Sequence, residues 1–392
     1  MLIKNAKVVD LRGERSADVL IEDGVIKKIG VNLRADEVID AKGAYLLPAL
    51  IDLNVRVLDD RINTTNLQAL GKQALEGGVG SVALIPDSTP PIDEEISLEF
   101  VKAQTLPIKL YPLVMGTKGE GLSEISILLK KGAGGIYTTS DINPYLLARI
   151  FEYAKMHQIP LHIAPRNKIF QDVGVMNEGK TAFELGLGGI DTLEEKAEVA
   201  KVIEYSEHYE VPVLFKGVST ARSLDLIADS HYCYAEVGIH HLLLSEEVCE
   251  GYNTLAKIMP PLRSEEERQR MLLALQEGKI DLLSSLHSPK SKVAKEVSFQ
   301  EAAFGIDGLE YLLPLAYTHL VRSHIIDLPK LTELLSANPA CFLGEKLGKV
   351  EEGYEAQLLL FDPEGSIEAP LYGKLEGHVR GVVLGDRYER VG

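Results

Sequence analysis

Alternating apolar and polar positions near both ends of the chain predict short β-strands. The alternation covers residues 6–9, 18–22 and 25–29, and Asp23-Gly24 separates the last two runs. An Asp-Gly pair between two alternating runs is a strong signal for a β-hairpin. The same texture returns at residues 357–361 and 381–386. We therefore expect the two chain ends to form one small β-sandwich domain.

In the middle of the chain, short apolar runs alternate with helical segments. The runs cover residues 51–57, 81–85, 108–114, 135–137, 160–163, 211–215, 232–236 and 280–284. Such alternation favours βα units around a parallel sheet, and eight units fit a (β/α)8 barrel. A doubly wound sheet would give a similar pattern. We expect an α/β protein with a barrel over residues 50–349 and a β-sandwich built from residues 1–49 plus 350–392.

Two charged segments predict helices on the surface of this barrel. Residues 194–209 combine charge with a helical pattern, and residues 264–268 read Ser-Glu-Glu-Glu-Arg. Serine is a favoured N-cap because its hydroxyl accepts from a free amide of the first turn. We expect Ser264 to begin a helix whose charged face contacts solvent.

Composition narrows the class of partner and the compartment. Among 392 residues, 45% are hydrophobic and the formal net charge is −17, which would repel a nucleic-acid backbone. Cys233, Cys249 and Cys341 are too widely spaced for a disulfide framework, which favours the cytoplasm. No run approaches the roughly 20 apolar residues of a membrane helix, and the first residues lack the features of a secretory signal.

Several motifs together resemble those of dihydroorotases in the amidohydrolase superfamily. They are Leu-Pro-Ala-Leu-Ile-Asp at 47–52, Glu-Gly-Gly-Val-Gly at 76–80, Val-Gly-Val-Met-Asn-Glu-Gly at 173–179, Val-Ser-Thr-Ala at 218–221, His-His-Leu-Leu-Leu at 240–244, Pro-Pro-Leu-Arg at 260–263, Gly-Ile-Asp-Gly-Leu-Glu at 305–310 and Asn-Pro-Ala at 338–340. Each motif alone is weak, but the set extends over nearly the whole chain. The resemblance implies a barrel flanked by a β-sandwich, with zinc at the C-terminal barrel face, that interconverts carbamoyl aspartate and dihydroorotate.

The positions that match the family's zinc ligands are mostly substituted in this sequence. A zinc ion lowers the pKa of bound water far below that of bulk water, to about 7, which supplies hydroxide at neutral pH. The family's His-x-His pair falls on Asn54 and Arg56. Arginine only donates hydrogen bonds and stays charged, so Arg56 cannot ligate zinc and would repel it.

Most of the remaining ligand positions are substituted as well. The ligand after the fourth barrel strand falls on Thr139 or Ser140, with Asp141 displaced by one or two residues. Of the two later histidines, one is retained as His162 and the other is Gly217. His162 is thus the only retained ligand, and we expect no metal.

The catalytic and substrate-binding positions are also changed. The family's catalytic aspartate falls on Leu286, which cannot carry a proton, and loss of a general base typically costs about 10²–10⁴-fold in rate. We expect no catalytic residue here. The positions that line the family's substrate pocket become a remnant pocket of Leu58, Asp87, Met259, His287 and Lys290.

Other motifs have simpler interpretations. Residues 174–181 match the phosphate-loop pattern G-x-x-x-x-G-K-[ST], but a poor strand precedes them, so we interpret the match as coincidence. The histidines at 231, 240 and 241 lack a completing cluster of metal ligands, so structural roles are favoured.

We therefore expect a non-catalytic dihydroorotase homologue in pyrimidine biosynthesis. It resembles the inactive dihydroorotase-like subunits that assemble with the catalytic subunit of aspartate transcarbamoylase, which implies a homo- or hetero-oligomer without nucleic acid or membrane partners. One alternative is an active cyclic-amide hydrolase with a reworked site of His162, His287, Asp87, Asp141 and Lys290, using one zinc or none. Another is a sensor whose Arg56 and Lys290 hold an anion.

Overall fold

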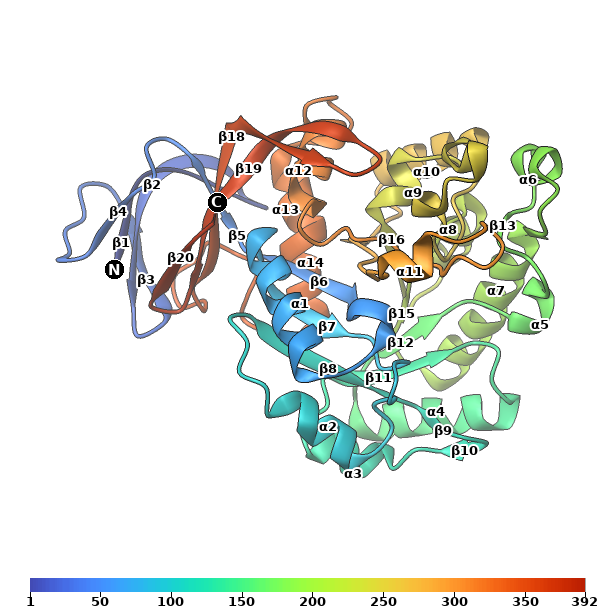
Figure 1. The fold of residues 1–392 in the computed structure, drawn as a ribbon. Helices are drawn as coiled ribbons and strands as arrows, with labels where there is room; N and C mark the ends of the chain where they lie inside the picture. The colour runs from blue at the N-terminus through green and yellow to red at the C-terminus, as the bar shows by residue number, and fades with distance from the viewer. Residues whose placement is uncertain (392) are drawn as a thin grey trace.

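The computed structural model describes residues 1–391, which fold into a barrel and an adjoining sheet (Figure 1). The barrel has eight parallel strands, which confirms the predicted (β/α)8 architecture. Its strands are β6 (Leu50–Val55), β7 (Val79–Leu84), β8 (Lys109–Met115), β11 (Gly135–Thr139), β12 (Leu161–Ala164), β15 (Val213–Phe215), β16 (Cys233–Gly238) and β17 (Leu282–Ser284). Each of them overlaps one predicted run.

Strands that follow one another along the chain, from β6 to β17, are neighbours in the sheet. The last strand, β17, packs against the first, β6, so the sheet curves into a barrel. All six residues of β7 are buried. Strands covered on both faces read as continuous apolar runs, which is why these segments lack a clear alternation.

Helices surround the barrel and fill the connections between its strands (Figure 1). They are α1 (Thr64–Glu76), α2 (Glu95–Lys102), α3 (Ile125–Lys130), α4 (Pro144–His157), α5 (Lys168–Gln171), α6 (Lys180–Leu185), α7 (Thr192–Tyr209), α8 (Ala221–Ala228), α9 (Ile239–Leu243), α10 (Glu265–Gln276), α11 (Lys292–Lys295), α12 (Leu312–Ala316), α13 (Leu328–Thr332) and α14 (Asn338–Leu343). Ser264 caps α10 by accepting from the amide of Glu267, as predicted.

The second sheet contains strands from both chain ends, as expected. Its strands are β1 (Leu2–Asp10), β2 (Gly13–Glu22), β3 (Val25–Gly30), β4 (Val38–Asp40), β5 (Tyr45–Pro48), β18 (Gln357–Ala369), β19 (Gly373–Leu384) and β20 (Arg387–Arg390). β5 joins the two halves because it pairs with both β1 and β18. Asp23 and Gly24 form the β2–β3 turn with φ of 53° and 74°, which confirms the hairpin. The exact domain boundaries stay a prediction.

The C-terminal hairpin is longer than the sequence pattern predicted. β18 continues beyond residue 361 and β19 begins before residue 381. The hairpin that they form lies beside α12 (Figure 1). Ile367 pairs with Leu375 in register, and both pack against the main core. This apolar pair holds an otherwise polar, glycine-containing segment in the extended conformation.

Two smaller strand pairs lie in the barrel's connections, β9 (Thr117–Lys118) with β10 (Gly121–Leu122), and β13 (Met176–Asn177) with β14 (Gly189–Ile190). β13 begins inside the segment that matches the phosphate-loop pattern, and no described strand ends at Gly174. The segment therefore lacks the strand, loop and helix order that a phosphate loop requires. Within residues 1–391, no helix is long and apolar enough to cross a membrane.

Candidate functional site

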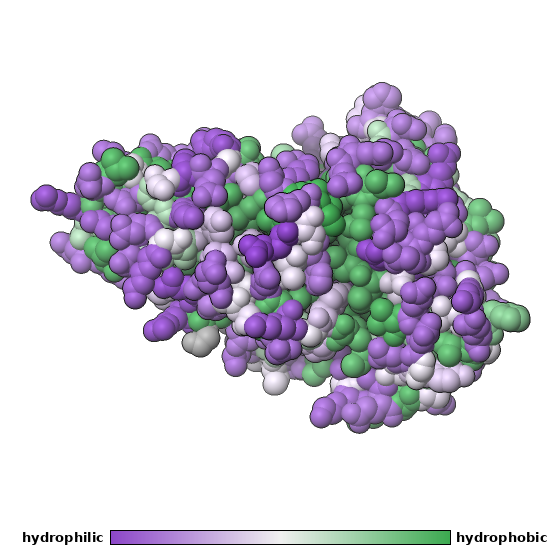
Figure 2. Space-filling model, turned by 90° about the horizontal axis from the view of Figure 1, so that it is seen from above, coloured by the Kyte–Doolittle hydropathy of each residue, from purple (hydrophilic) through white to green (hydrophobic). Residues whose placement is uncertain are grey.

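The main cavity lies at the C-terminal ends of the barrel strands and has a volume of about 380 Å³. Active sites of barrel enzymes occupy this face because the loops that follow the strands converge there. Seen from above, polar residues cover most of the molecule, and a band of apolar residues crosses its middle (Figure 2). The cavity brings together seven of the expected positions, Asn54, Arg56, Asp87, Gly217, Met259, Leu286 and Lys290.

Arg56, directly after β6, makes an ion pair across the cavity wall. Its guanidinium donates to both carboxylate oxygens of Asp87, and the Nη2–Oδ2 distance is 3.0 Å. Arg166 Nη2 and the Tyr137 hydroxyl each lie 3.4 Å from the same Asp87 oxygen. Burial alone raises the pKa of Asp87, but Arg56 and Arg166 hold it below its usual value. Asp87 is therefore an anion already bound by this chain's own cations.

A lysine occupies the centre of the barrel mouth, where sequence reasoning assigned no role. Lys216 follows β15, and its ammonium donates to the Glu236 carboxylate and to the Leu53 carbonyl oxygen at 2.7 Å. Asn54 and Ser284 donate to the other Glu236 oxygen at 2.6 and 3.1 Å. Glu236 thus receives three donors from three separate strands or strand ends.

Both members of this ion pair are almost completely buried, with 2% and 1% of their side chains exposed. Burial lowers the pKa of Lys216, whereas Glu236 raises it. A lysine directly at the end of a buried strand was the one sequence signal for this pair. Its partner could not be read from the sequence, because 20 residues and a helix separate Lys216 from Glu236.

His162 on β12 is the retained ligand position, and its surroundings are apolar and cationic. Its ring packs edge-on against Phe342 at 5.3 Å between centroids, and its Nδ1 has no partner among the described residues. Burial lowers the pKa of His162 well below 6.5, and the nearby Lys216 ammonium lowers it further. The imidazole is therefore neutral at pH 7, with an ammonium group rather than other ligands near it.

The expected positions after β11 turn away from the cavity. The Thr139 hydroxyl donates to Asp141, and Asp141 accepts from the amide of Lys168 at 3.0 Å. The Ser140 hydroxyl donates to the Arg166 carbonyl oxygen at 3.0 Å. These residues tie the loop after β11 to α5. Asp141 accepts hydrogen bonds in these contacts, so its carboxylate is not placed as a ligand in the cavity.

Leu286 fills the position of the missing catalytic aspartate. It follows β17 with φ of +48°, and its side chain lies against Gly238, where an added Cβ would approach Leu286 Cδ1 to 2.1 Å. A left-handed conformation is uncommon for leucine, while aspartate and asparagine tolerate it better. The backbone therefore keeps a conformation suited to a polar residue, but the side chain is aliphatic. Gly217, opposite, also has a positive φ of 68°.

The remaining pocket positions are held by contacts of their own. His287 Nδ1 lies 3.2 Å from an Asp307 oxygen, and the His287 carbonyl oxygen accepts from the Arg56 amide at 2.8 Å. The Lys290 ammonium pairs with Asp60. Leu58 lines a neighbouring cavity instead of the main one. Arg56 and Lys290 are both occupied by carboxylates, so neither is free to hold an external anion as expected for a sensor.

The donor set does not fit a zinc ion. Within residues 1–391, no group of three or more His, Cys, Asp or Glu side chains is placed to hold a metal. Lys216 and Arg56 put two positive charges among the positions that match the zinc ligands. These charges would repel a zinc ion strongly where water is excluded. An internal ammonium–carboxylate pair lies among the positions that match the zinc ligands implied by the resemblance.

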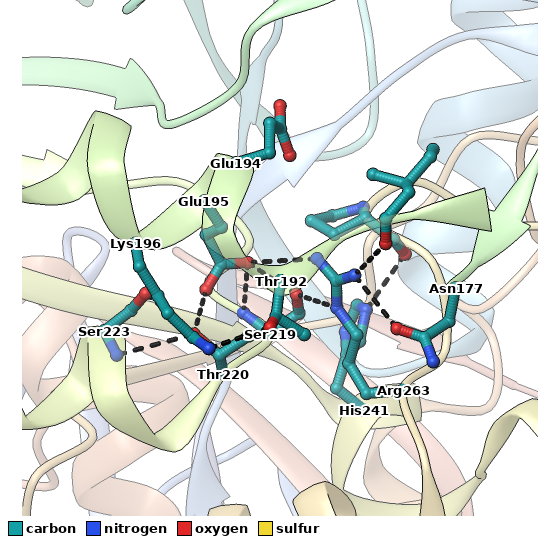
Figure 3. Close-up of polar contacts among 12 residues, drawn as sticks. Asn177, Thr192, Glu194, Glu195, Lys196, Ser219, Thr220, Ser223, His241 and Arg263 are labelled. Atoms are coloured by element: carbon teal, nitrogen blue, oxygen red, sulfur yellow. Dashed lines mark hydrogen bonds and ion pairs between the residues drawn. The ribbon is translucent and has the colours of Figure 1, made fainter. Parts of the chain in front are cut away.

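Behind the cavity, a buried polar network joins the loops that follow β12, β15 and β16 (Figure 3). Arg263 Nε donates to the Ser219 hydroxyl at 3.0 Å, and Arg263 Nη1 donates to the Asn177 side-chain oxygen at 3.2 Å and to the Ile190 carbonyl oxygen at 3.0 Å. Glu195 accepts from the Ser219 amide and lies 3.9 Å from Arg263 Nη2. The arginine of the Pro-Pro-Leu-Arg motif thus fixes the wall of the cavity.

Three buried histidines predict a loss of stability in mild acid. Burial lowers the pKa of His240 to about 3, of His241 to about 4, and of His162 well below 6.5. The unfolded chain, with histidine pKa values near 6.5, binds protons that the folded chain does not. Stability is therefore full above about pH 6.5 and falls towards pH 4, by up to about 1.4 kcal/mol per pH unit for each histidine.

Urea unfolding at a series of pH values checks this expectation. The variant His241→Gln, which retains a donor for the Pro260 carbonyl oxygen at 3.0 Å, should flatten the pH dependence. The exposed His324→Gln is the matched control and should leave the dependence unchanged. A wild-type unfolding free energy that is constant between about pH 7 and 4 would show that these imidazoles are protonated in the fold.

Comparison with known proteins agrees with this fold. No family model matches the chain. It is 34% identical over 381 residues to a dihydroorotase of Ruminiclostridium cellulolyticum, covering 92% of this chain and 89% of that one. It is 33% identical over 379 residues to a dihydroorotase of Thermoanaerobacter sp., covering 93% and 88%.

Among solved structures, the L-hydantoinase of Arthrobacter aurescens superposes with a TM-score of 0.89 at 21% identity, covering 100% of this chain and 96% of that one. The dihydropyrimidinase of Brevibacillus agri superposes with a TM-score of 0.86 at 20% identity, covering 100% and 95%. These structures share the barrel and its flanking sheet. The extent and identity of the sequence matches show that this chain belongs to the dihydroorotase family.

Proposed function

We propose that this chain is a non-catalytic member of the dihydroorotase family, which assembles with aspartate transcarbamoylase and stabilises it in pyrimidine biosynthesis. The observation that carries the first half of the proposal is the Lys216–Glu236 pair in the barrel mouth. An ammonium group there supplies the positive charge that a zinc ion would bring, but it offers no site at which water or a carbonyl oxygen can be activated.

The loss of chemistry extends to each step of the reaction. Leu286 provides no carboxylate to move a proton, and among the described residues no metal-binding cluster supplies a hydroxide. Two cations that line the cavity already have carboxylate partners, because Arg56 pairs with Asp87 and Lys216 pairs with Glu236. A substrate carboxylate would have to displace one of these, which requires separating a buried ion pair.

The proposed assembly with a partner is supported by a contrast between the substituted site positions and the rest of the chain. The sequence matches a dihydroorotase over 92% of its length, whereas the positions that correspond to the family's ligands and acid-base residue are mostly substituted. A chain kept for its contacts retains its core and surface but not its ligands. We infer aspartate transcarbamoylase as the partner from the resemblance to inactive dihydroorotase-like subunits that assemble with it.

Co-expression with the transcarbamoylase catalytic chain of the same organism tests the assembly. We expect both chains to elute together in size-exclusion chromatography at a mass above either alone, and the carbamoyl transfer activity to survive heating longer in the complex. An active family member expressed in the same way is the matched control for non-specific association. Separate elution together with unchanged heat inactivation would contradict the assembly.

An active cyclic-amide hydrolase is the second candidate function. It is favoured by the retained cavity of about 380 Å³ and by relatives at 33–34% identity that are dihydroorotases. Of its proposed residues, Asp87 and Lys290 are paired and Asp141 faces α5, which leaves His162 and His287 with free ring nitrogens. Turnover of carbamoyl aspartate or dihydroorotate that is lost in His162→Phe would support this candidate over the first.

A further inference from the structure

A second cavity of about 290 Å³ lies between the barrel mouth and the tip of the β18–β19 hairpin. It shares Lys290, Gly305 and Ile306 with the main cavity, so the two are neighbours separated by one segment of wall. Most of its lining is apolar, with Leu255, Leu371 and Tyr372 among the apolar residues and Lys290, Lys295 and Asp307 among the charged ones. Nothing in the family chemistry described above uses this space.

Lys295 is buried in the wall of this second cavity, and the buried Lys257 contacts it. Lys257 is 3% exposed and Lys295, which lines the cavity, is 7% exposed. Lys295 Nζ donates to the carbonyl oxygens of Thr254 and Lys257, both at 3.0 Å. Lys257 Nζ donates to the carbonyl oxygens of Phe299 at 2.7 Å and Gln300 at 3.1 Å. All four acceptors are neutral.

Neither lysine has a counter-ion. Within residues 1–391, no carboxylate oxygen forms an ion pair with Lys257 or Lys295, unlike the other buried cations Lys216 and Arg263. Burial lowers the pKa of both lysines to about 8, and for Lys295 the neighbouring Lys257 and Lys290 lower it further. At neutral pH both groups still carry most of their positive charge, and an unpaired buried charge is costly.

The other titratable groups around Lys295 do not neutralise it. Lys290 is paired with Asp60, and the Asp307 carboxylate is held by His287 at 3.2 Å and by the Gln73 amide at 3.1 Å. Burial raises the pKa of the Cys249 thiol to about 12, which keeps it uncharged. An ammonium has three donors, and the two carbonyl oxygens on Lys295 leave one donor unused.

We propose that the second cavity binds a small organic anion, whose carboxylate accepts from Lys295 and whose apolar body packs against Leu255, Leu371 and Tyr372. The ligand supplies the negative charge that the protein itself lacks at this point. A charged hydrogen bond formed out of water is stronger than a neutral one, so Lys295 contributes most of the polar binding energy. This site is separate from the family's catalytic position and does not depend on whether the chain is an enzyme.

Isothermal titration of the full chain with the straight-chain carboxylates acetate, butyrate and hexanoate tests the proposal. We expect one site, with affinity rising along the series because each added methylene buries apolar surface. Lys295→Met should weaken hexanoate binding about ten- to a hundredfold, since it removes a charged hydrogen bond. The exposed Lys292→Met on the same helix is the matched control and should bind as the wild type does.

The variant should fold, because methionine fills a similar volume and removes an unpaired buried charge; an unchanged or higher Tm without ligand checks this. Absence of binding heat for every carboxylate with the wild-type chain would overturn the proposal. Equal hexanoate binding by Lys295→Met and the wild type would overturn the assignment of the lysine. Inorganic phosphate binding as tightly as hexanoate would overturn the assigned ligand class, because the apolar wall would then contribute nothing.

Discussion

Lys216→Met is expected to lower the free energy of unfolding by about 3–5 kcal/mol, because it leaves the Glu236 carboxylate buried without its cation. Both side chains are inaccessible, so water cannot replace the lost partner. The substitution also removes the donor to the Leu53 carbonyl oxygen at 2.7 Å. Urea unfolding monitored by circular dichroism measures the change directly.

A second substitution should restore most of this stability. Glu236→Gln removes the orphaned charge and keeps a carbonyl oxygen to accept from Asn54, which lies 2.6 Å from the native carboxylate. The double variant Lys216→Met with Glu236→Gln is therefore expected to be clearly more stable than Lys216→Met alone. The exposed Lys292→Met serves as the control for loss of a lysine. If Lys216→Met alone unfolds within about 0.5 kcal/mol of the wild type, the pair is not the structural centre described.

Arg263→Met is expected to have an effect of similar size, about 3–5 kcal/mol, for a related reason. The arginine satisfies three acceptors on three separate segments and provides the positive charge beside Glu195 (Figure 3). Its removal leaves Glu195 without its neighbouring cation and the Asn177 side-chain oxygen without this donor inside the protein. The loops after β12 and β15 then lose their common anchor.

The conservative variant separates geometry from charge. Arg263→Lys keeps the charge but cannot donate to three acceptors in a fixed plane, so it should recover only part of the loss. Arg270→Met, in an exposed ion pair with Glu266 on α10, is the matched control and should change stability by less than about 0.5 kcal/mol. Full recovery by Arg263→Lys would show that the charge alone matters, which contradicts the role given to the planar guanidinium.

The sequence predicted the barrel well because each strand is a local apolar run. Residues 211–215 and 280–284 contain β15 and β17, although the observed strands are only three residues long. The observed strand bounds differ from the predicted ones by at most two residues, and β16, for example, continues to Gly238, beyond the predicted end at residue 236. The strand continues because Val237 and Gly238 pair with Leu283 and Ser284 of β17, a contact that depends on the closed sheet.

The site was only partly predictable from the sequence. Matching positions to the family located Asn54, Arg56, Gly217 and Leu286 in the cavity, since motif register fixes strand ends. The sequence could not show that Arg56 bonds Asp87, because 31 residues separate them along the chain. The sequence pattern assigned no role to Lys216, since that role depends on contacts with Leu53 of β6 and Glu236 of β16.

Ion pairs in the cavity explain why the sequence alone could not show which cations are free to bind an anion. Arg56 and Lys290 were interpreted as free cations for an anionic ligand, but Asp87 and Asp60 neutralise them. The buried positive charge that has no carboxylate partner lies instead at Lys295, in the wall of the neighbouring cavity, and at Lys257 beside it. Buried cations find partners wherever the fold provides them, and only the folded structure shows which ones do not.

The Lys216–Glu236 ion pair lies among the positions that match the family's zinc ligands, and the proposed function predicts that the chain neither holds zinc there nor turns over the family's substrates. Metal analysis of the full chain, purified without chelator from zinc-supplemented cells and assayed with carbamoyl aspartate and dihydroorotate, tests it most directly. We predict zinc far below one ion per chain and no conversion above the background without protein. One tightly bound zinc per chain, together with turnover that His162→Phe abolishes, would contradict the claim.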